Sequence, residues 1–272
     1  MKLLHNGRLL AQTGFALPLP NRGLAFGDSF FETLIFVKGC LRYADDHLAR
    51  MKQAAAALHL ILPATLASAE ALENALGALA RANRLPAARL RLQLWRAGGG
   101  RYTPPTDMAE WLATAEAFLT DETPLQQADF ALETQSIFSP LSFCKGPQAW
   151  LYVRAARERA QRELDEIILC DAAGHLAEAG AAAIFWVKEA VLFTPALASG
   201  CVAGVRRAQV LRAARVQGIT CREGLFLRKE LLTAEAVFTA NVAAVRAVER
   251  VGSVSFSPLI PPFLARPTLA AE

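Results

Sequence analysis

Residues 142–185, SFCKGPQAWLYVRAARERAQRELDEIILCDAAGHLAEAGAAAIF, form the stretch that decides the fold. A lysine, Lys145, stands immediately before a predicted helix, and a hairpin follows whose second strand carries one acidic residue, Glu178. The predicted elements are a helix at about Gln148–Glu163 and strands at Glu166–Cys170 and His175–Ala179. The stretch therefore brings an amine and a carboxylate together on one helix–hairpin unit.

Strands and helices alternate on both sides of this stretch. The Asn6-Gly7 turn predicts an opening hairpin over Met1–Leu10. Upstream, strands are expected at Phe31–Val37, Leu41–Tyr43, Arg89–Trp95, Trp111–Phe118 and Phe130–Ser136. One helix is expected to begin after the capping residues Asp45 and Asp46 and to end at Pro63, and a second is expected at Ala67–Asn83. Downstream, strands are expected at Ala182–Val187, Val191–Phe193 and Val237–Ala240, and a helix from near Val205. This alternation predicts a two-domain protein of the α+β or α/β class. We place a small N-terminal domain at 1–119, a linker at 120–127 and a larger C-terminal domain, carrying Lys145, at 128–272.

Composition restricts the function classes. The 272 residues are 53% hydrophobic and 20% charged, a globular balance, and the formal charge of +4 comes from scattered basic residues, which argues against a nucleic-acid partner. Five cysteines without a CxxC pair indicate reduced thiols, and four scattered histidines give no metal-ligand spacing. We find no signal-type segment and no membrane span, so we expect a cytoplasmic protein without a metal site.

Lys145 and Glu178 are the sharpest candidates for chemistry. Lys145 has apolar neighbours, which favour the neutral amine that a Schiff-base lysine needs. The alternative is an ordinary lysine at a helix start whose amine reaches solvent. Glu178 lies among small residues, either as a charge at a hairpin edge or as a buried carboxylate with a specific partner. A carboxylate facing a pyridine nitrogen would keep that ring protonated.

Two further segments are typical of anion binding. Gly200-Cys201-Val202-Ala203-Gly204 precedes the helix that begins Val205-Arg206-Arg207, where backbone amides can hold a phosphate. The same residues also suit an ordinary loop. His47 and Arg50 lie three residues apart on one face of a predicted helix. This face is either exposed to solvent, or it directs the arginine at a phosphate or carboxylate.

A glycine-rich loop gives a weaker signal for substrate binding. Arg96, Arg101 and Tyr102 flank Gly98-Gly99-Gly100, and arginines on a mobile loop can hold a substrate carboxylate. Cys144, beside the lysine, has no histidine partner and is interpreted as a buried small side chain. No GxGxxG turn joins a strand to a helix, which disfavours a nicotinamide cofactor.

These blocks, in this order, resemble the class IV aminotransferases, the fold type IV enzymes that use pyridoxal 5′-phosphate (PLP). The family includes branched-chain and D-amino-acid aminotransferases and 4-amino-4-deoxychorismate lyase. The resemblance runs from about Asn6 to Val248. The blocks that carry it are NRGLAFGDSFFETL (21–34), HLARM (47–51), DEIILCDAAGHLAEAGAAAIFWV (165–187) and LFTPALASGCVAGVRR (192–207). It implies a D-amino-acid aminotransferase-like fold with the cofactor between a small and a larger domain, and a homodimer.

The resemblance also implies roles for individual residues. Lys145 would form the Schiff base with PLP and Glu178 would bind the pyridine nitrogen. Arg50, together with main-chain amides near Val205 and Arg206, would bind the phosphate. Phe31, Arg96, Arg101 and Tyr102 are the candidate substrate contacts.

Some positions depart from the family's pattern. Ala183 stands where an asparagine is usual, Trp150 replaces a tyrosine of the branched-chain enzymes, and Gly146 replaces a residue that is often polar. Arg206 replaces a threonine near the phosphate, and Val242 stands where a Ser or Thr is common. Each replacement removes a hydrogen bond worth roughly 1 kcal/mol, which bears on cofactor affinity and substrate class.

The function predicted from these residues is PLP-dependent transfer of an amino group between an amino acid and a 2-oxo acid through a Lys145 Schiff base. The alternative is a 4-amino-4-deoxychorismate lyase, which would use the same residues to eliminate pyruvate and leave 4-aminobenzoate for folate synthesis. The short length, the GGGRYTPP loop and the GSVSFS segment resemble that subgroup. A third reading is a non-catalytic relative that keeps the fold.

Overall fold

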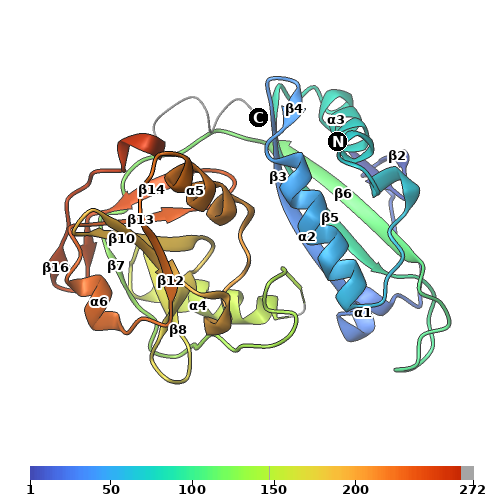
Figure 1. The fold of residues 1–272 in the computed structure, drawn as a ribbon. Coiled ribbons are helices and arrows are strands. Elements are labelled where there is room, and N and C mark those ends of the chain that lie inside the picture. Colours follow the sequence, from blue (N-terminus) through green and yellow to red (C-terminus); the bar gives the residue numbers. More distant parts are fainter. Residues whose placement is uncertain (147, 265–272) are drawn as a thin grey trace. The chain divides into compact units, whose positions relative to one another are not determined.

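Alternating apolar residues build one antiparallel sheet from the first part of the chain. The computed structural model describes residues 1–146 and 148–264, and its contacts divide them into two units. The six-stranded sheet of the first unit has the order β2-β1-β6-β5-β3-β4 (Figure 1). Its strands are β1 (Lys2–His5), β2 (Arg8–Ala11), β3 (Ser29–Val37), β4 (Cys40–Leu41), β5 (Ala87–Arg96) and β6 (Ala109–Ala117). The helices of this unit are α1 (Arg22–Phe26), α2 (Ala44–Ala57) and α3 (Ala69–Ala82), with a short 3-10 turn, η1, at Ala64–Leu66.

Helix α3 shows how the sequence covers this sheet. Its first turn is capped by Ser68, whose hydroxyl accepts a hydrogen bond from the Ala71 amide. Leu72, Leu76 and Leu79 follow at helical spacing, and each is fully buried. The leucine stripe therefore packs on the sheet and leaves the polar face of α3 to solvent.

The second unit contains two five-stranded sheets. Their orders are β12-β11-β10-β13-β14 and β16-β15-β7-β8-β9. The strands are β7 (Ala128–Phe130), β8 (Glu166–Cys170), β9 (Leu176–Ala179), β10 (Ala183–Lys188), β11 (Val191–Pro195), β12 (Cys221–Gly224), β13 (Ala236–Ala240), β14 (Val245–Val248), β15 (Arg250–Val251) and β16 (Val254–Ser255). The helices are α4 (Ala149–Gln161), α5 (Val205–Val216) and α6 (Arg228–Leu232), with 3-10 turns η2 (Leu197–Ser199) and η3 (Pro262–Leu264).

The near-continuous apolar runs of β8 and β10 are explained by burial on both faces. Ile168 and Trp186 point into a core shared by the two sheets. Phe185, on the opposite face of β10, packs with Leu211 of α5, and Ile167, on the opposite face of β8, packs with Ala155 of α4. The two helices therefore cover the outer faces of the two sheets, as Figure 1 shows.

Most predicted elements lie within a few residues of the observed ones, and three differ. The strand predicted at Phe130–Ser136 is wrong beyond residue 130, because the Glu158 carboxylate accepts the amides of Leu132 and Glu133 and removes them from the ladder. Helix α2 ends at Ala57, well before Pro63. The turn predicted after Asn21 is the short helix α1, capped by the Asn21 side chain.

The predicted domain boundaries, 1–119, 120–127 and 128–272, stay a prediction, and the last eight residues lie outside the described part. One placement differs. The sequence assigns Lys145 to the second domain, whereas the contacts group Cys144, Lys145 and Gly146 with the first unit. Among the contacts that join this segment to the first unit is a backbone hydrogen bond of 2.8 Å, which the Phe31 amide of β3 donates to the Lys145 carbonyl.

Within the described residues, no helix has both the length and the apolar character needed to cross a bilayer.

Candidate active site

A buried ion pair joins β3 to α2 in the first unit. Glu32 alternates with the outward-facing Phe31, so its carboxylate points under α2 and is 1% exposed. Arg50 donates from Nε and Nη2 to its two oxygens at 2.8 and 2.6 Å, and His47 Nδ1 lies 2.7 Å from Oε2. The interpretation of His47 and Arg50 as a solvated face is therefore wrong, since both side chains are buried.

The electrostatics of this cluster keep it ionised. Burial alone would raise the pKa of Glu32, but the charge of Arg50 and the hydrogen bonds from His47 and Arg50 outweigh it and hold that pKa at about 2. Burial lowers the pKa of His47, and the positive charges of Arg50 and Lys145 lower it further. The hydrogen bond and the charge of Glu32 act in the opposite direction and only partly offset this. Arg50 is thus a fixed cation, and the bonds to Glu32 use two of its five N–H donors.

Lys145 lies beside this cluster. Its side chain is half-buried, and Nζ is 6.0 Å from the centroid of the Phe31 ring. The preceding Cys144 is buried, and burial raises the pKa of its thiol to about 11, so the thiol stays protonated. The amine is therefore the nucleophile available on this loop, in agreement with the interpretation of Cys144 as a small hydrophobic side chain.

The other face of the same sheet carries a groove that sequence reasoning missed. It has a volume of about 550 Å³ and is lined by Met1, Gln12, Thr33, Arg89, Arg91, Thr114, Ala115 and Glu116. The Arg91 guanidinium carbon lies 3.5 Å from the centroid of the Phe31 ring. Burial, and then the charge of Arg89, lower the pKa of Arg91, so an anion would relieve an unfavourable environment there. Arg89 and Arg91 alternate with leucines along β5, and this pattern could have indicated that both arginines lie on the face opposite the helices.

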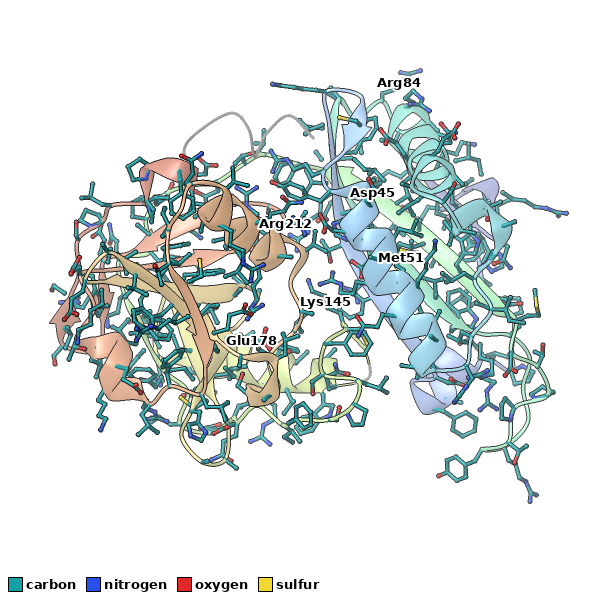
Figure 2. All side chains as sticks on the ribbon, in the orientation of Figure 1. Asp45, Met51, Arg84, Lys145, Glu178 and Arg212 are labelled. Carbon is teal, nitrogen blue, oxygen red and sulfur yellow. The ribbon has the colours of Figure 1, made fainter. Side chains whose placement is uncertain are left out.

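In the second unit, Glu178 is a buried carboxylate on β9. The residue is 5% exposed, which excludes the hairpin-edge reading. Tyr152 of α4 donates from its hydroxyl to Glu178 Oε1 at 2.6 Å, and the Val202 amide lies 3.3 Å from both carboxylate oxygens. Figure 2 labels Glu178 among the strands of this unit. Sequence reasoning missed Tyr152, and nothing in its local sequence distinguishes it from a core tyrosine.

The loop that binds Glu178 also holds the chain that leads to Lys145. Val202 donates to Glu178, and the next residue, Ala203, donates its amide to the Phe143 carbonyl at 2.9 Å. Phe143 precedes Lys145 by two residues in the sequence. The Glu178 carboxylate and the Phe143 carbonyl thus accept hydrogen bonds from two consecutive amides, those of Val202 and Ala203.

Helix α5 begins at Val205, as predicted. Its N-cap, Gly204, has no side chain that could accept the first-turn amides, so an anion is suited to that end. The neighbouring arginines differ: Arg207 is buried and donates to the Pro195 carbonyl and to Glu223, while Arg206 is partly buried at the helix start. Arg207 therefore has a structural role in holding β11 and β12 against the helix.

The three candidates around the glycine loop divide into two kinds. Arg96 is buried and donates to the carboxylates of Asp28 and Asp107 and to the carbonyls of Leu58 and His59. This geometry gives it a structural role and does not support a substrate contact. Arg101 and Tyr102 are exposed, Tyr102 to 88%. The carbonyls of both residues accept hydrogen bonds from Arg22, which anchors the loop.

The positions that depart from the family's pattern lie in three different places in the second unit. Ala183 begins β10 and pairs with Ala240, and Trp150 is half exposed on the first turn of α4. Asn241 caps the turn before Val242 by accepting the amides of Ala243 and Ala244.

Comparisons with known proteins agree on one family and one fold. The profile described as "Amino-transferase class IV" matches residues 29–251. A D-alanine aminotransferase from Bacillus licheniformis is 27% identical over 277 residues, covering 95% of this chain and 93% of the relative. An aminodeoxychorismate lyase from Vibrio harveyi is 27% identical over 231 residues, with 83% of each chain covered.

A solved structure confirms the predicted fold. The branched-chain aminotransferase from Thermoproteus uzoniensis, crystallised with norvaline, superposes with a TM-score of 0.86 at 22% identity. The likeness covers 97% of this chain and 91% of the other. At this identity the likeness establishes the fold alone.

Proposed function

This chain belongs to the class IV aminotransferases, a family of PLP-dependent enzymes, and we propose that it transfers an amino group between an amino acid and a 2-oxo acid. The observation that carries the proposal is the buried Glu178 carboxylate. It is held by the Val202 amide, while the adjacent Ala203 amide holds the segment that leads to Lys145. A buried carboxylate needs hydrogen-bond or charge partners, and a pyridine nitrogen has the right chemistry to be one besides Tyr152 and the Val202 amide.

The residues present fit the cofactor. In the first unit, Lys145 offers a half-buried amine for the aldehyde and Arg50 a cation for the phosphate. In the second unit, Glu178 offers a carboxylate for the ring nitrogen, and the glycine-capped start of α5 at Val205 and Arg206 offers donors for the phosphate. When bound, PLP supplies an electron sink that stabilises a carbanion at the substrate α-carbon.

Lys145 then has two tasks. Its amine would hold the cofactor through the aldehyde, and the amine that a substrate sets free would then move a proton at the substrate α-carbon. Glu178 would hold the ring nitrogen in its protonated form. The Glu32–Arg50 ion pair keeps the guanidinium in place, because moving it would leave a buried carboxylate unpaired.

The groove on the open face of the first sheet is the proposed place for a substrate carboxylate. Arg91 and Arg89 supply positive charge there, and the centroid of the Phe31 ring lies 3.5 Å from the Arg91 guanidinium carbon and 6.0 Å from the Lys145 amine. We therefore propose Arg91 as a substrate contact in addition to Phe31, Arg101 and Tyr102. The planar guanidinium suits a bidentate carboxylate.

The test is a pair of reactions on the purified protein with PLP. One follows 2-oxo acid formation from D-alanine, L-leucine or L-glutamate in the presence of a second 2-oxo acid. The other follows pyruvate and 4-aminobenzoate from aminodeoxychorismate. Amino transfer that is lost in Lys145→Ala supports the proposal, whereas pyruvate elimination without amino transfer contradicts it.

The second candidate function is the lyase. It is favoured by the similarity to the Vibrio harveyi protein named aminodeoxychorismate lyase and by the GGGRYTPP loop. The same Lys145 and Glu178 would serve it, since both reactions begin with removal of the α-proton. We also propose that the protein is a homodimer.

A further inference from the structure

Tyr152 connects α4 to the Glu178 carboxylate, and no motif of the sequence assigns it a role. It lies one turn into α4, seven residues after Lys145. Its ring packs against the small core of Ala131, Ala155, Ile167 and Leu169, while its hydroxyl reaches Glu178 Oε1 at 2.6 Å.

We propose that Tyr152 is a positioning residue that orients the Glu178 carboxylate toward the pyridine nitrogen and sets how strongly it competes for the ring proton. The inference rests on the proposed function, because it assigns Glu178 to the cofactor ring. Tyr152 acts through Glu178 and does not itself touch the reacting atoms.

The geometry explains the orienting effect. The Val202 amide is equally distant, at 3.3 Å, from both oxygens of Glu178, so it holds the carboxylate in place without selecting one oxygen. The Tyr152 hydroxyl binds Oε1 alone, and at a distance typical of a charge-assisted bond. Packing of the phenol ring fixes the donor, so the rotation of the carboxylate about its last bond is fixed as well.

The chemistry explains the effect on the proton. A hydrogen bond to the charged form of a carboxylate favours that form and makes it a weaker base. Burial, and then the charge of Glu178, raise the pKa of Tyr152, so the phenol remains a donor at every working pH. With Tyr152 in place, the proton shared between the carboxylate and the ring therefore stays on the ring nitrogen.

Tyr152→Phe is the informative variant, because it removes the hydroxyl and keeps the ring in its core. We expect the ¹⁵N resonance of the bound cofactor's ring nitrogen to move toward the unprotonated value in protein reconstituted with ¹⁵N-labelled PLP. We also expect kcat to fall about ten-fold, with KM changed less than kcat, as for the loss of one hydrogen bond to a charged group.

Arg157→Gln is the matched control, since Arg157 lies on the solvent side of the same helix. Both variants are first compared by urea unfolding of the protein without PLP, and equal midpoints exclude a general loss of structure. The control should keep the wild-type ¹⁵N resonance and kcat.

The outcomes separate this inference from the proposed function. A wild-type protein that binds no PLP overturns both. A wild-type protein with PLP on Lys145, together with a Tyr152→Phe variant whose ¹⁵N resonance and kcat are unchanged, overturns the inference alone. A shifted resonance in Tyr152→Phe and an unshifted one in Arg157→Gln support it.

Discussion

Glu32 shows how a single residue links stability to the site. Its carboxylate is buried between Arg50 and His47, with its pKa lowered from 4.5 to about 2. A depressed folded-state pKa contributes stability above the unfolded value, and that contribution is lost as the pH falls from about 4.5 toward 2. The ionised Glu32 carboxylate therefore keeps Arg50 in place at neutral pH, and this ion pair is lost when Glu32 is protonated in acid.

Glu32→Gln should lower the free energy of unfolding at pH 7 by about 3 kcal/mol, because the change leaves a buried guanidinium without its counter-charge. The difference between wild type and variant should shrink as the pH falls from 5 to 3. Urea unfolding at pH 7, 5 and 3 measures both effects.

Glu116→Gln is the control for this experiment. Its carboxylate pairs with Arg89 at 3.7 Å, but it is 67% exposed, so the loss should stay under about 1 kcal/mol at every pH. A Glu32→Gln variant that behaves like this control would contradict the account of the cluster.

At the residue scale the sequence analysis named neither the partners of Glu32 nor that of Tyr152, and the two omissions have different causes. Glu32 stands at an inward-facing position of an alternating strand, and a buried charge needs a partner. The alternation could therefore have been used to predict that Glu32 pairs with a basic residue of the next helix. The hydroxyl contact of Tyr152 could not be predicted in this way, because it depends on how α4 packs beside β9. Arg96 was assigned to substrate because loop position alone does not reveal internal carbonyl partners.

At the scale of elements, the loop from Gly200 to Gly204 connects η2 to α5 and supplies the amide that binds Glu178. Gly200 has a φ of +85°, and a Cβ there would lie 2.7 Å from Ser136 Oγ and 2.9 Å from the backbone of Ile137 and Phe138. The loop is thus packed against the segment that leads to Lys145.

Gly200→Ala should destabilise the protein by at least about 2 kcal/mol and weaken PLP binding, since the backbone must shift. Gly218→Ala tests the backbone angle alone, because its φ is +69° but its Cβ would meet nothing within 4 Å. It should cost about 1 kcal/mol and leave PLP affinity unchanged. Urea unfolding and fluorescence titration with PLP measure the two effects, and equal losses in the two variants would argue against the packing of this loop.

The elements that the sequence predicted best are those with a strong period. The run of β5 alternates from Arg89 to Leu94, and α3 carries a leucine stripe behind a serine cap. The segment after β7 was mispredicted because a distant carboxylate, Glu158, takes its amides. The short helix α1 was missed because five residues carry too little periodicity to predict a helix.

At the scale of the whole molecule, the second unit exposes several large apolar side chains that a solvated monomer would bury. They are Leu132, Ile137, Phe138, Trp150 and Val153, each more than half exposed. Apolar surface of this kind is typical of an interface.

We therefore expect a homodimer with a mass near twice 29.4 kDa by light scattering at micromolar concentration. Trp150→Glu combined with Val153→Glu should shift the protein toward the monomer. A wild-type protein that is monomeric at that concentration would rule out the dimer.

The sequence blocks, taken in order, were enough to predict the fold and the family, because together they resemble the class IV aminotransferases. The grouping of Lys145 with the first unit was not predictable. It depends on contacts between residues far apart in the chain, such as the hydrogen bond from Phe31 to Lys145.

The central claim is that the Lys145 amine carries the cofactor. The most direct measurement is borohydride reduction of the purified protein with PLP, followed by proteolysis and mass spectrometry of the peptides. The account predicts a phosphopyridoxyl group on Lys145 and none in Lys145→Ala, with Lys188→Ala labelled like wild type. A label on another lysine, or a protein that binds PLP without any label on Lys145, would contradict it.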